Sequence, residues 1–247
     1  MTTIKLDPGA AMLLDALHGA GHAAYAVGGC VRDSLLGQAP HDWDLCTSAR
    51  PEQVMALFGE EKCIPTGLQH GTVTVKQGGR LYETTTFRTE GAYSDGRHPD
   101  AVCFVPDVRE DLARRDFTIN AMAWSLDGAR FGELVDPFGG MDDLEDRIIR
   151  TPCDPDVTFS DDPLRMMRAV RFASQLGFTI EGETFDAIRR NAHRIRIVSR
   201  ERIAAELNKI VLSPVPSMGF ELLELTGLLE LIFPEMHNLK GVEKRGA

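Results

Sequence analysis

The 247-residue sequence contains no run of eighteen apolar residues, and its N-terminus lacks the basic and apolar regions of a signal peptide. A membrane-spanning helix needs about 20 mostly apolar residues and export needs a leader, so the sequence predicts a cytoplasmic protein without a membrane segment. Its five cysteines are widely spaced and form no Cys-x-x-Cys pair. This spacing indicates neither a disulfide framework nor a zinc site, and we expect reduced, mostly buried thiols.

An overall positive charge is missing too. The net charge of −10 argues against a general nucleic-acid-binding protein, which is normally basic. The charge is uneven, because residues 1–160 carry −11 whereas residues 161–212 carry +3. The positive charge of the second range comes almost entirely from arginine, at Arg165, Arg168, Arg171, Arg189, Arg190, Arg194, Arg196, Arg200 and Arg202. Arginine favours paired hydrogen bonds to phosphates or base edges.

The most informative stretch is Tyr25-Ala-Val-Gly-Gly-Cys-Val-Arg-Asp-Ser-Leu-Leu-Gly37, which predicts a short apolar strand, a diglycine turn and a helix. Gly28 and Gly29 allow a ligand to approach the backbone, because neither carries a Cβ. The N–H groups at the start of the helix can bind phosphate oxygens, with Arg32 beside them as a charged fork. The alternative is an ordinary tight turn before a helix.

Two carboxylates follow this stretch. Asp42 and Asp44 flank Trp43, so in an extended strand both carboxylates point to the same face. Two oxygen ligands on one face suit a hard divalent cation such as Mg²⁺, and the alternative is a solvated strand edge. A phosphate site and a metal site on neighbouring elements together indicate nucleotide chemistry.

Helix and strand patterns alternate in the first half of the chain. We expect helices at 7–20 and 51–58, and a hairpin formed by residues 71–76 and 80–88. In the first helix, core positions are predicted at Leu13, Leu14 and Leu17. Glu83 lies in the second arm of the hairpin, where it is either a solvent-facing residue or a third carboxylate beside the metals.

Residues 89–113 show little apolar periodicity and predict a long loop. Long loops in compact domains are often functional lids, and the alternative is a simple surface excursion. The segment 114–123 predicts the start of a helix, with Asp116 as its cap. Its predicted core residues are Phe117, Ile119 and Met122.

From about residue 141 onward helix signals replace strand signals, so we place a domain boundary near 140–150. Helices are predicted at 141–149, 162–176, 182–193, 200–212 and 217–229. In the second of these, polar residues recur at every third position: Asp162, Arg165, Arg168 and Arg171. One interpretation is a helix cap followed by surface arginines. The other is a carboxylate and a guanidinium that together read a nucleobase edge.

Seven short motifs occur in order through residues 23–240. They are Gly28-Gly-Cys-Val-Arg-Asp33, Asp42-Trp-Asp44, Pro65-Thr-Gly-Leu-Gln-His-Gly-Thr-Val-Thr-Val75, Glu83-Thr-Thr-Thr-Phe-Arg88, Arg114-Arg-Asp-Phe-Thr-Ile-Asn120, Asp161-Asp-x-x-Arg165 and Glu201-Arg-Ile-Ala-Ala-Glu-Leu207. In this order and at these spacings they resemble the class II tRNA nucleotidyltransferases and bacterial poly(A) polymerases. The third motif resembles the CCA-adding branch of that group.

The resemblance implies an α+β fold, with a nucleotidyltransferase-type mixed-sheet head in residues 1–145. An all-helical neck, residues 146–247, would recognise the nucleotide base and begin a truncated RNA-binding body. Asp42 and Asp44 would be catalytic and hold Mg²⁺, with Glu83 as the third carboxylate. Nucleotide contacts would come from Gly28, Gly29, Arg32, Arg115, Asp116, Asp162, Arg165, Arg168 and Arg171. The segment Ser94–Asp100 resembles the flexible loop of the family.

The implied activity is transfer of CMP and AMP from CTP and ATP to the 3′ end of tRNA without a nucleic-acid template. Two Mg²⁺ ions would promote attack by the terminal hydroxyl and departure of pyrophosphate. Asp162 would accept a hydrogen bond from the exocyclic amine of C or A, and Arg165 would donate to an acceptor on the same base. G and U present the opposite pattern and would be rejected.

Three other functions remain open: an A-adding or poly(A) polymerase, a non-catalytic RNA-binding remnant, and a nucleotide-sugar glycosyltransferase. The last of these does not explain Asp162 and Arg165. The chain departs from the family pattern at Asp161, where many members have Glu, and at Trp43, where Ile or Phe is usual. It also ends at Ala247, where longer members continue, which indicates a truncated chain or a short form. The oligomeric state stays open.

Overall fold

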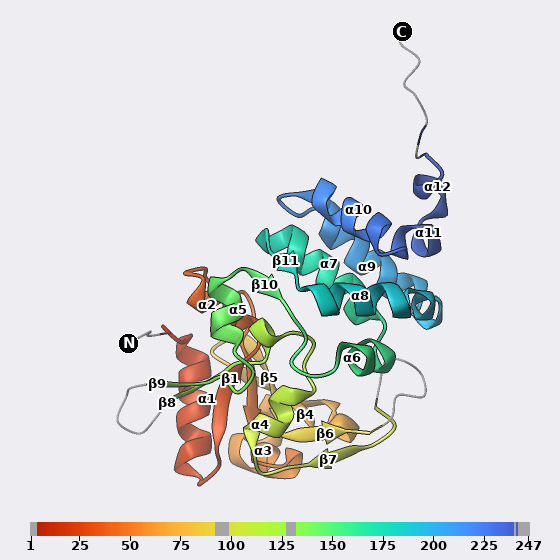
Figure 1. Cartoon of the computed structure of the whole chain (residues 1–247). Coiled ribbons are helices and arrows are strands. Elements are labelled where there is room, and N and C mark those ends of the chain that lie inside the picture. The colour runs from red at the N-terminus through yellow and green to blue at the C-terminus, as the bar shows by residue number, and fades with distance from the viewer. Residues whose placement is uncertain (1–3, 92–98, 127–131, 240, 242–247) are drawn as a thin grey trace. The chain divides into compact units, whose positions relative to one another are not determined.

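The computed structural model describes residues 4–91, 99–126, 132–239 and 241. The chain forms two compact units (Figure 1). Residues 1–92 and 99–145 build the first unit, which contains a large sheet, and residues 146–247 belong to the second unit, which is mainly helical. The expected α+β class, with a mixed-sheet part followed by a helical part, is therefore confirmed.

Seven strands form the sheet of the first unit, in the order β3-β4-β5-β2-β1-β8-β9. Their bounds are β1 Ala24–Val27, β2 Asp44–Thr47, β3 Cys63–Gly67, β4 Thr72–Gln77, β5 Arg80–Thr86, β8 Ala123–Leu126 and β9 Gly132–Val135. Strands β2 and β5 run parallel, whereas the other neighbouring pairs are antiparallel. The parallel pair places the start of β2 beside the middle of β5, and the antiparallel pair places it beside the C-terminal end of β1.

The predicted hairpin is confirmed as β4–β5, with Gln77 opposite Arg80. Only Gly78 and Gly79 lie between these residues, with φ values of 57° and 79°. A two-residue turn with positive φ at both positions matches the twist of the strands that it joins, and glycine adopts this conformation without steric cost.

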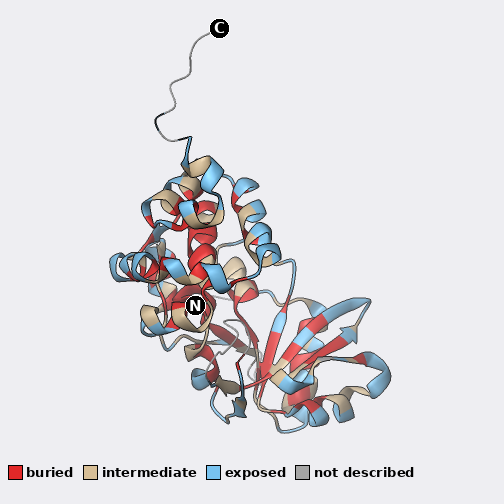
Figure 2. Cartoon of the chain, turned by 90° about the vertical axis from the view of Figure 1, so that its right-hand side faces the viewer, coloured by how far each residue is buried: buried red, intermediate tan, exposed pale blue. Residues whose placement is uncertain are grey.

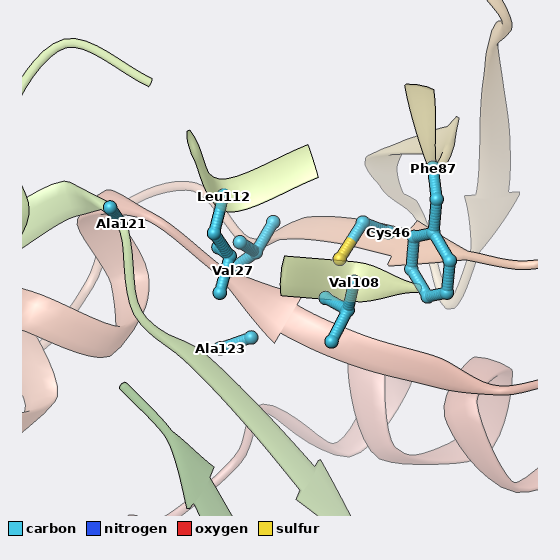
Figure 3. Close-up of a cluster of buried hydrophobic side chains, with 7 residues drawn as sticks. All are labelled: Val27, Cys46, Phe87, Val108, Leu112, Ala121 and Ala123. Atoms are coloured by element: carbon cyan, nitrogen blue, oxygen red, sulfur yellow. The ribbon is translucent and has the colours of Figure 1, made fainter. Parts of the chain in front are cut away.

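Helices cover both faces of the sheet. They are α1 Pro8–Gly19, α2 Gly29–Leu35, α3 Pro51–Phe58, α4 Val108–Ala113 and α5 Gly140–Glu145. Helix α1 begins where the Asp7 carboxylate accepts hydrogen bonds from the backbone of Gly9 and Ala10, and it buries its predicted core residues Leu13, Leu14 and Leu17. Helix α4 packs Val108 and Leu112 against Val27, Cys46 and Ala123 of the sheet (Figure 3).

The prediction of a long loop at 89–113 is wrong for the described residues. Strands β6 Arg88–Glu90 and β7 Val102–Phe104 pair as an antiparallel ribbon, and α4 follows them. Each element is short, so none produces a clear period in the sequence. Residues 92–98, with most of the loop-like segment Ser94–Asp100, lie outside the described residues.

The prediction of a helix starting at 114–123 is also wrong. The segment forms one 3₁₀ turn, Thr118–Asn120, and then enters β8, where Ala26 of β1 pairs with Trp124. Phe117, Ile119 and Met122 are fully buried as predicted. Strand pairing and core packing override the local helical pattern here.

The second unit is organised around α7 Leu164–Leu176, which contacts α9 and α10. The other elements are β10 Ile148–Ile149, α6 Pro155–Asp161, β11 Thr179–Ile180, α8 Gly182–Asn191, the 3₁₀ helix Ala192–Ile197, α9 Arg200–Val211, α10 Pro216–Leu225, α11 Leu228–Ile232 and α12 Pro234–His237. Nine residues of α7 are buried, and Figure 2 shows the burial pattern of both units.

Three helix predictions in this half need correction. The helix expected at 162–176 is α7, and it begins two residues later than expected, at Leu164, because Asp162 has an extended backbone, with φ −131° and ψ 99°, and Pro163 follows it. The helix expected at 141–149 ends at Glu145, before the short strand β10, which pairs with β11. The helix expected at 217–229 is interrupted at Gly227, where φ is 79°.

No helix among the described residues is long and apolar enough to cross a membrane. All five cysteines are free thiols, of which Cys30, Cys46 and Cys63 are buried and Cys103 and Cys153 are exposed.

Candidate active site

The first-unit carboxylates gather where β2 begins, next to Glu83 in the middle of β5. Asp44 opens β2 and lies opposite Val27 of β1. On the other side of β2, Leu45 lies beside Thr84 of the parallel strand β5, so Glu83 lies beside Asp44 on the same face. Asp42 is two residues before Asp44, and both aspartates are exposed while Trp43 between them is only 5% exposed. The alternation expected from the sequence is present.

These three carboxylates repel one another. Asp42, Asp44 and Glu83 make no hydrogen bond or ion pair through their side chains with any other described residue. Loss of hydration is the largest influence on Asp44, and together with the charges of Glu83 and Asp42 it raises the pKa of the Asp44 carboxyl to about 6, although Arg115 opposes the rise. Asp44 as a whole remains accessible to solvent. The loss of hydration therefore comes from protein atoms close to its carboxylate and not from full burial of the residue.

A divalent cation fits this arrangement better than any protein group does. Accessible carboxylates that lie close together repel one another, so they gain most from a nearby positive charge. Within the described residues, no three or more acidic, histidine or cysteine side chains are arranged to enclose a metal. Mg²⁺ does not require such an enclosure, because it is commonly held by one or two carboxylates together with water and substrate phosphates.

A glycine turn adjoins the carboxylates. Gly28 follows β1 directly and has φ 81° and ψ −132°, a backbone conformation that residues with a Cβ rarely adopt. A Cβ at this position would lie 3.1 Å from Nη1 of Arg115. The absence of a side chain at Gly28 therefore leaves room for the Arg115 guanidinium beside the turn. Helix α2 begins at Gly29 and has only seven residues.

Arg32 of α2 is held by two side chains. Its Nη1 donates to Oδ1 of Asn120 at 2.7 Å, and its Nε donates to Oδ1 of Asp33 at 2.8 Å. Asn120 is itself fixed by Asp116, whose Oδ1 accepts from Asn120 Nδ2 at 3.1 Å and from the backbone of Phe117 at 2.9 Å. Asp116 is 7% exposed. In these contacts Asp116 orients Asn120, and through it Arg32.

Arg115 reaches the turn from the chain that follows α4. Its Nη2 donates to Oδ2 of Asp111 at 3.3 Å, and its buried Nε has no hydrogen-bond partner in the part of the chain that the structure describes. Buried donors without partners are uncommon. An unsatisfied guanidinium donor beside a glycine turn and three carboxylates is suited to an anionic ligand, such as a nucleotide phosphate, that arrives together with a cation.

In the second unit, Asp162 occupies the break between α6 and α7. Its Oδ1 accepts from the backbone N–H of Leu164 at 3.1 Å, and its Oδ2 accepts from Nη2 of Arg202 at 2.8 Å. The first contact is the capping role that the sequence left open. Arg165 follows as the second residue of α7, and its backbone N–H donates to the Asp162 carbonyl at 3.0 Å.

The next two arginines of the row have different surroundings. Arg168 places its guanidinium 5.5 Å from the centre of the Phe172 ring. Arg171 is 8% exposed and forms an ion pair with Glu206 of α9, with Nε 3.0 Å from Oε2. Through its ion pair Arg171 joins α7 to α9, and the family resemblance implies that it also lies near the base.

The sequence did not assign Asn120, Asp111 or Arg202 to the site. Asn120 was visible inside a recognised motif, three residues after Phe117, but its amide could not be linked to Arg32, which lies 88 positions away. Asp111 and Arg202 had no local signal that distinguished them from surface charges.

Comparison with known families gives two matches. Residues 24–150 match the model of the poly A polymerase head domain, and residues 177–240 match the model described as the probable RNA and SrmB-binding site of polymerase A. The first match contains the carboxylate cluster, the glycine turn and Arg115.

Individual relatives give a consistent result. The CCA-adding enzyme of Anoxybacillus flavithermus is 47% identical over 228 residues, which are 92% of this chain and 56% of the relative. That of Lactobacillus helveticus is 50% identical over 218 residues, covering 88% of this chain and 53% of the relative. The chain thus spans about half the length of the curated relatives that it matches.

Solved structures show the same relationship. The CCA-adding enzyme of Bacillus stearothermophilus in complex with CTP has a TM-score of 0.80 and 43% identity, over 90% of this chain and 53% of that one. The Thermotoga maritima CCA-adding enzyme complexed with tRNA_CCA has a TM-score of 0.78 and 28% identity, over 93% of this chain and 54% of that one.

Proposed function

The chain belongs to the poly A polymerase head-domain family, and from this premise we propose that it transfers CMP and AMP from CTP and ATP to the 3′ end of tRNA. The observation that carries this proposal is the convergence of Asp42, Asp44 and Glu83 with the glycine turn and Arg115 beside the start of β2. The matched relatives are named CCA-adding enzymes. With tRNA as the substrate, we also propose a cytoplasmic location.

We assign Mg²⁺ to Asp42 and Asp44, with Glu83 as the adjacent carboxylate. When bound there, the metal would supply activation of the attacking 3′-hydroxyl and charge stabilisation of the departing pyrophosphate. The protein holds both aspartates on one face by burying Trp43. The carboxylates thereby concentrate negative charge at the place where a cation is needed.

The triphosphate is assigned to the glycine turn and two arginines. Gly28 and Gly29 carry no side chain that would hold a ligand off, Arg32 is held by Asn120 and Asp33, and Arg115 keeps a donor without a partner among the described residues. Guanidinium groups that are fixed before the ligand arrives lose little conformational entropy on binding. They orient the α-phosphate for in-line attack.

Base choice is assigned to Asp162 and Arg165. An ionised carboxylate only accepts hydrogen bonds, and a guanidinium only donates them. Cytosine and adenine present an amine donor next to a ring acceptor, which satisfies both side chains. Uracil and guanine would leave these groups unpaired, which is a strong form of rejection.

A single product analysis tests the proposal. Purified protein is incubated with tRNA lacking CCA and with CTP, ATP or both nucleotides, and the 3′ ends are sequenced. CC from CTP alone and CCA from both nucleotides is the expected result. Runs of A indicate the poly(A) polymerase alternative, which the name of the matched head-domain family keeps open. No extension under any condition overturns the proposal.

A further inference from the structure

Asp111 of α4 is a charged residue whose side chain is completely buried. Its Oδ1 accepts from Arg114 Nη2 at 2.9 Å and from the backbone of Arg88 at 3.2 Å, and its Oδ2 accepts from Arg115 Nη2 at 3.3 Å. Burial alone would raise the pKa of this carboxyl, but Arg114 and Arg115 lower it below its ordinary value. Asp111 therefore remains an anion inside the protein.

The contacts of Asp111 extend into a cluster of three arginines and two acidic residues. Glu90 pairs with Arg114 at 2.9 Å and with Arg88 at 2.8 Å. Among the described residues, Arg115 lies at one end of this chain of contacts, with one carboxylate partner and a buried Nε that has no hydrogen-bond partner. The Arg115 guanidinium therefore keeps donor capacity at the end of the cluster beside Gly28.

The scaffold under Asp111 also supports the glycine turn. Leu112, the next residue on α4, packs in the same cluster as Val27, the residue that precedes Gly28 (Figure 3). Val27 is 1% exposed and Leu112 is 0% exposed. Because both are fixed in one core, the distance between the Asp111 carboxylate and the turn is set by packing and not by flexible side chains.

We propose that Asp111 is a positioning residue for nucleotide binding, which fixes the Arg115 guanidinium against the Gly28–Gly29 turn so that its free donors meet the triphosphate. This inference rests on the proposed function, since it takes a nucleoside triphosphate as the ligand. Asp111 does not touch the ligand; it acts through Arg115. Without the carboxylate, the guanidinium keeps its charge but loses the partner that fixes its direction.

The test compares Asp111→Asn with Glu110→Gln, a neighbouring variant that removes the same charge from an exposed side chain of α4. Equilibrium binding of CTP is measured with Mg²⁺ and without tRNA, so that no transfer occurs. We expect Asp111→Asn to weaken CTP binding about tenfold or more, because it removes a charged hydrogen bond, and Glu110→Gln to leave binding unchanged. In turnover, KM for CTP should rise more than kcat falls.

A double-mutant cycle with Arg115→Ala separates positioning from a general structural effect. If Asp111 acts through Arg115, Asp111→Asn changes CTP binding less than about twofold in the Arg115→Ala background. The same loss in both backgrounds, or wild-type binding by Asp111→Asn, overturns the inference. Wild-type protein that binds neither CTP nor ATP refutes the proposed function itself.

Arg114→Gln provides a second route if Asp111→Asn does not fold. This variant removes the other side-chain partner of Asp111 but keeps the contact between Asp111 and Arg115. We expect CTP binding within about threefold of wild type, since the guanidinium at the turn keeps its carboxylate. A loss as large as that of Arg115→Ala would show that the whole cluster, and not the Asp111 contact, sets the affinity.

Discussion

The candidate site carboxylates of the two units differ in how many hydrogen bonds and ion pairs they form. In the first unit, Asp42, Asp44 and Glu83 lie together with no hydrogen bond or ion pair to other described residues, and the pKa of Asp44 rises to about 6. In the second unit, both oxygens of Asp162 are occupied, one by the backbone of Leu164 and one by Arg202. The first group has a charge that a cation can neutralise, whereas Asp162 has a fixed direction.

This difference matches the two tasks of the proposed reaction. Holding a metal needs negative charge that the protein itself has not compensated. Distinguishing one base from another needs hydrogen-bonding groups that cannot rotate to accept the wrong partner. In the proposed reaction, the first group would determine whether transfer occurs, and Asp162 would help determine which nucleotide is transferred.

The largest effect is expected from the first unit. Asp42→Ala and Asp44→Ala should each lower nucleotide transfer by at least about a thousandfold, because several kcal/mol of metal-dependent stabilisation is lost. Removal of one of three repelling charges should leave the fold intact. Transfer rates in Mg²⁺ and melting temperatures are measured beside Glu52→Gln, which changes an exposed carboxylate on α3. Activity within tenfold of the parent would exclude the metal assignment.

In the second unit, the largest effect on stability is expected at a buried ion pair. Arg171→Met should lower the free energy of unfolding by about 3–5 kcal/mol, because it leaves Glu206 buried without its guanidinium partner. Arg190→Gln breaks an exposed pair with Asp156 and should cost at most about 1 kcal/mol. Denaturant unfolding of the two variants measures the contrast. Equal losses would show that Arg171 is not a structural residue.

Base selection should change by a smaller factor. Arg165→Ala should reduce the preference for CTP and ATP over UTP and GTP by roughly 10- to 150-fold, the value of a hydrogen bond to a charged partner. Asp162→Asn keeps an oxygen for the backbone of Leu164 but loses the charge and gains a donor. We expect its four single-nucleotide incorporation rates to change in ratio. Unchanged ratios with a lower melting temperature would identify Asp162 as a cap only.

The smallest effect is a dependence of stability on pH. The folded pKa of Asp44, about 6, lies above the ordinary value of 3.8, so the folded state binds the proton more tightly and loses stability as the pH rises from 4 to 6. In metal-free protein, Asp44→Asn should melt a few degrees (~2–4 °C) above the parent at pH 8, and near pH 4 the two should coincide. A difference in melting temperature that does not vary with pH would show that the raised pKa of Asp44 is not its cause.

Parts of the candidate site and of the fold could be predicted from the sequence where the signal lies in adjacent residues. Asp42, Trp43 and Asp44 needed only strand alternation, and Gly78-Gly79 needed only turn chemistry. Contacts between distant segments could not be predicted, because no local pattern links Arg32 to Asn120 or Asp162 to Arg202. Their pairing depends on how the sheet order and the helix packing bring separate segments together.

The errors in the predicted fold have the same physical origin. Residues 114–123 have a helical pattern, but β8 gains more by pairing with β1 than a short helix gains from local hydrogen bonds. The segment 89–113 lacks a period because its elements have only three to six residues. The periodic segments from residue 141 onward were predicted well in position, and their errors lie at helix boundaries, at Glu145, Asp162 and Gly227.

The separation between transfer and base choice is tested most directly by sequencing the 3′ ends that three proteins add to tRNA lacking CCA, with all four nucleoside triphosphates present. The account predicts CCA from the wild type, no extension by Asp44→Ala, and extension containing U and G by Arg165→Ala. Near wild-type extension by Asp44→Ala, or products of Arg165→Ala that contain only C and A, would contradict it.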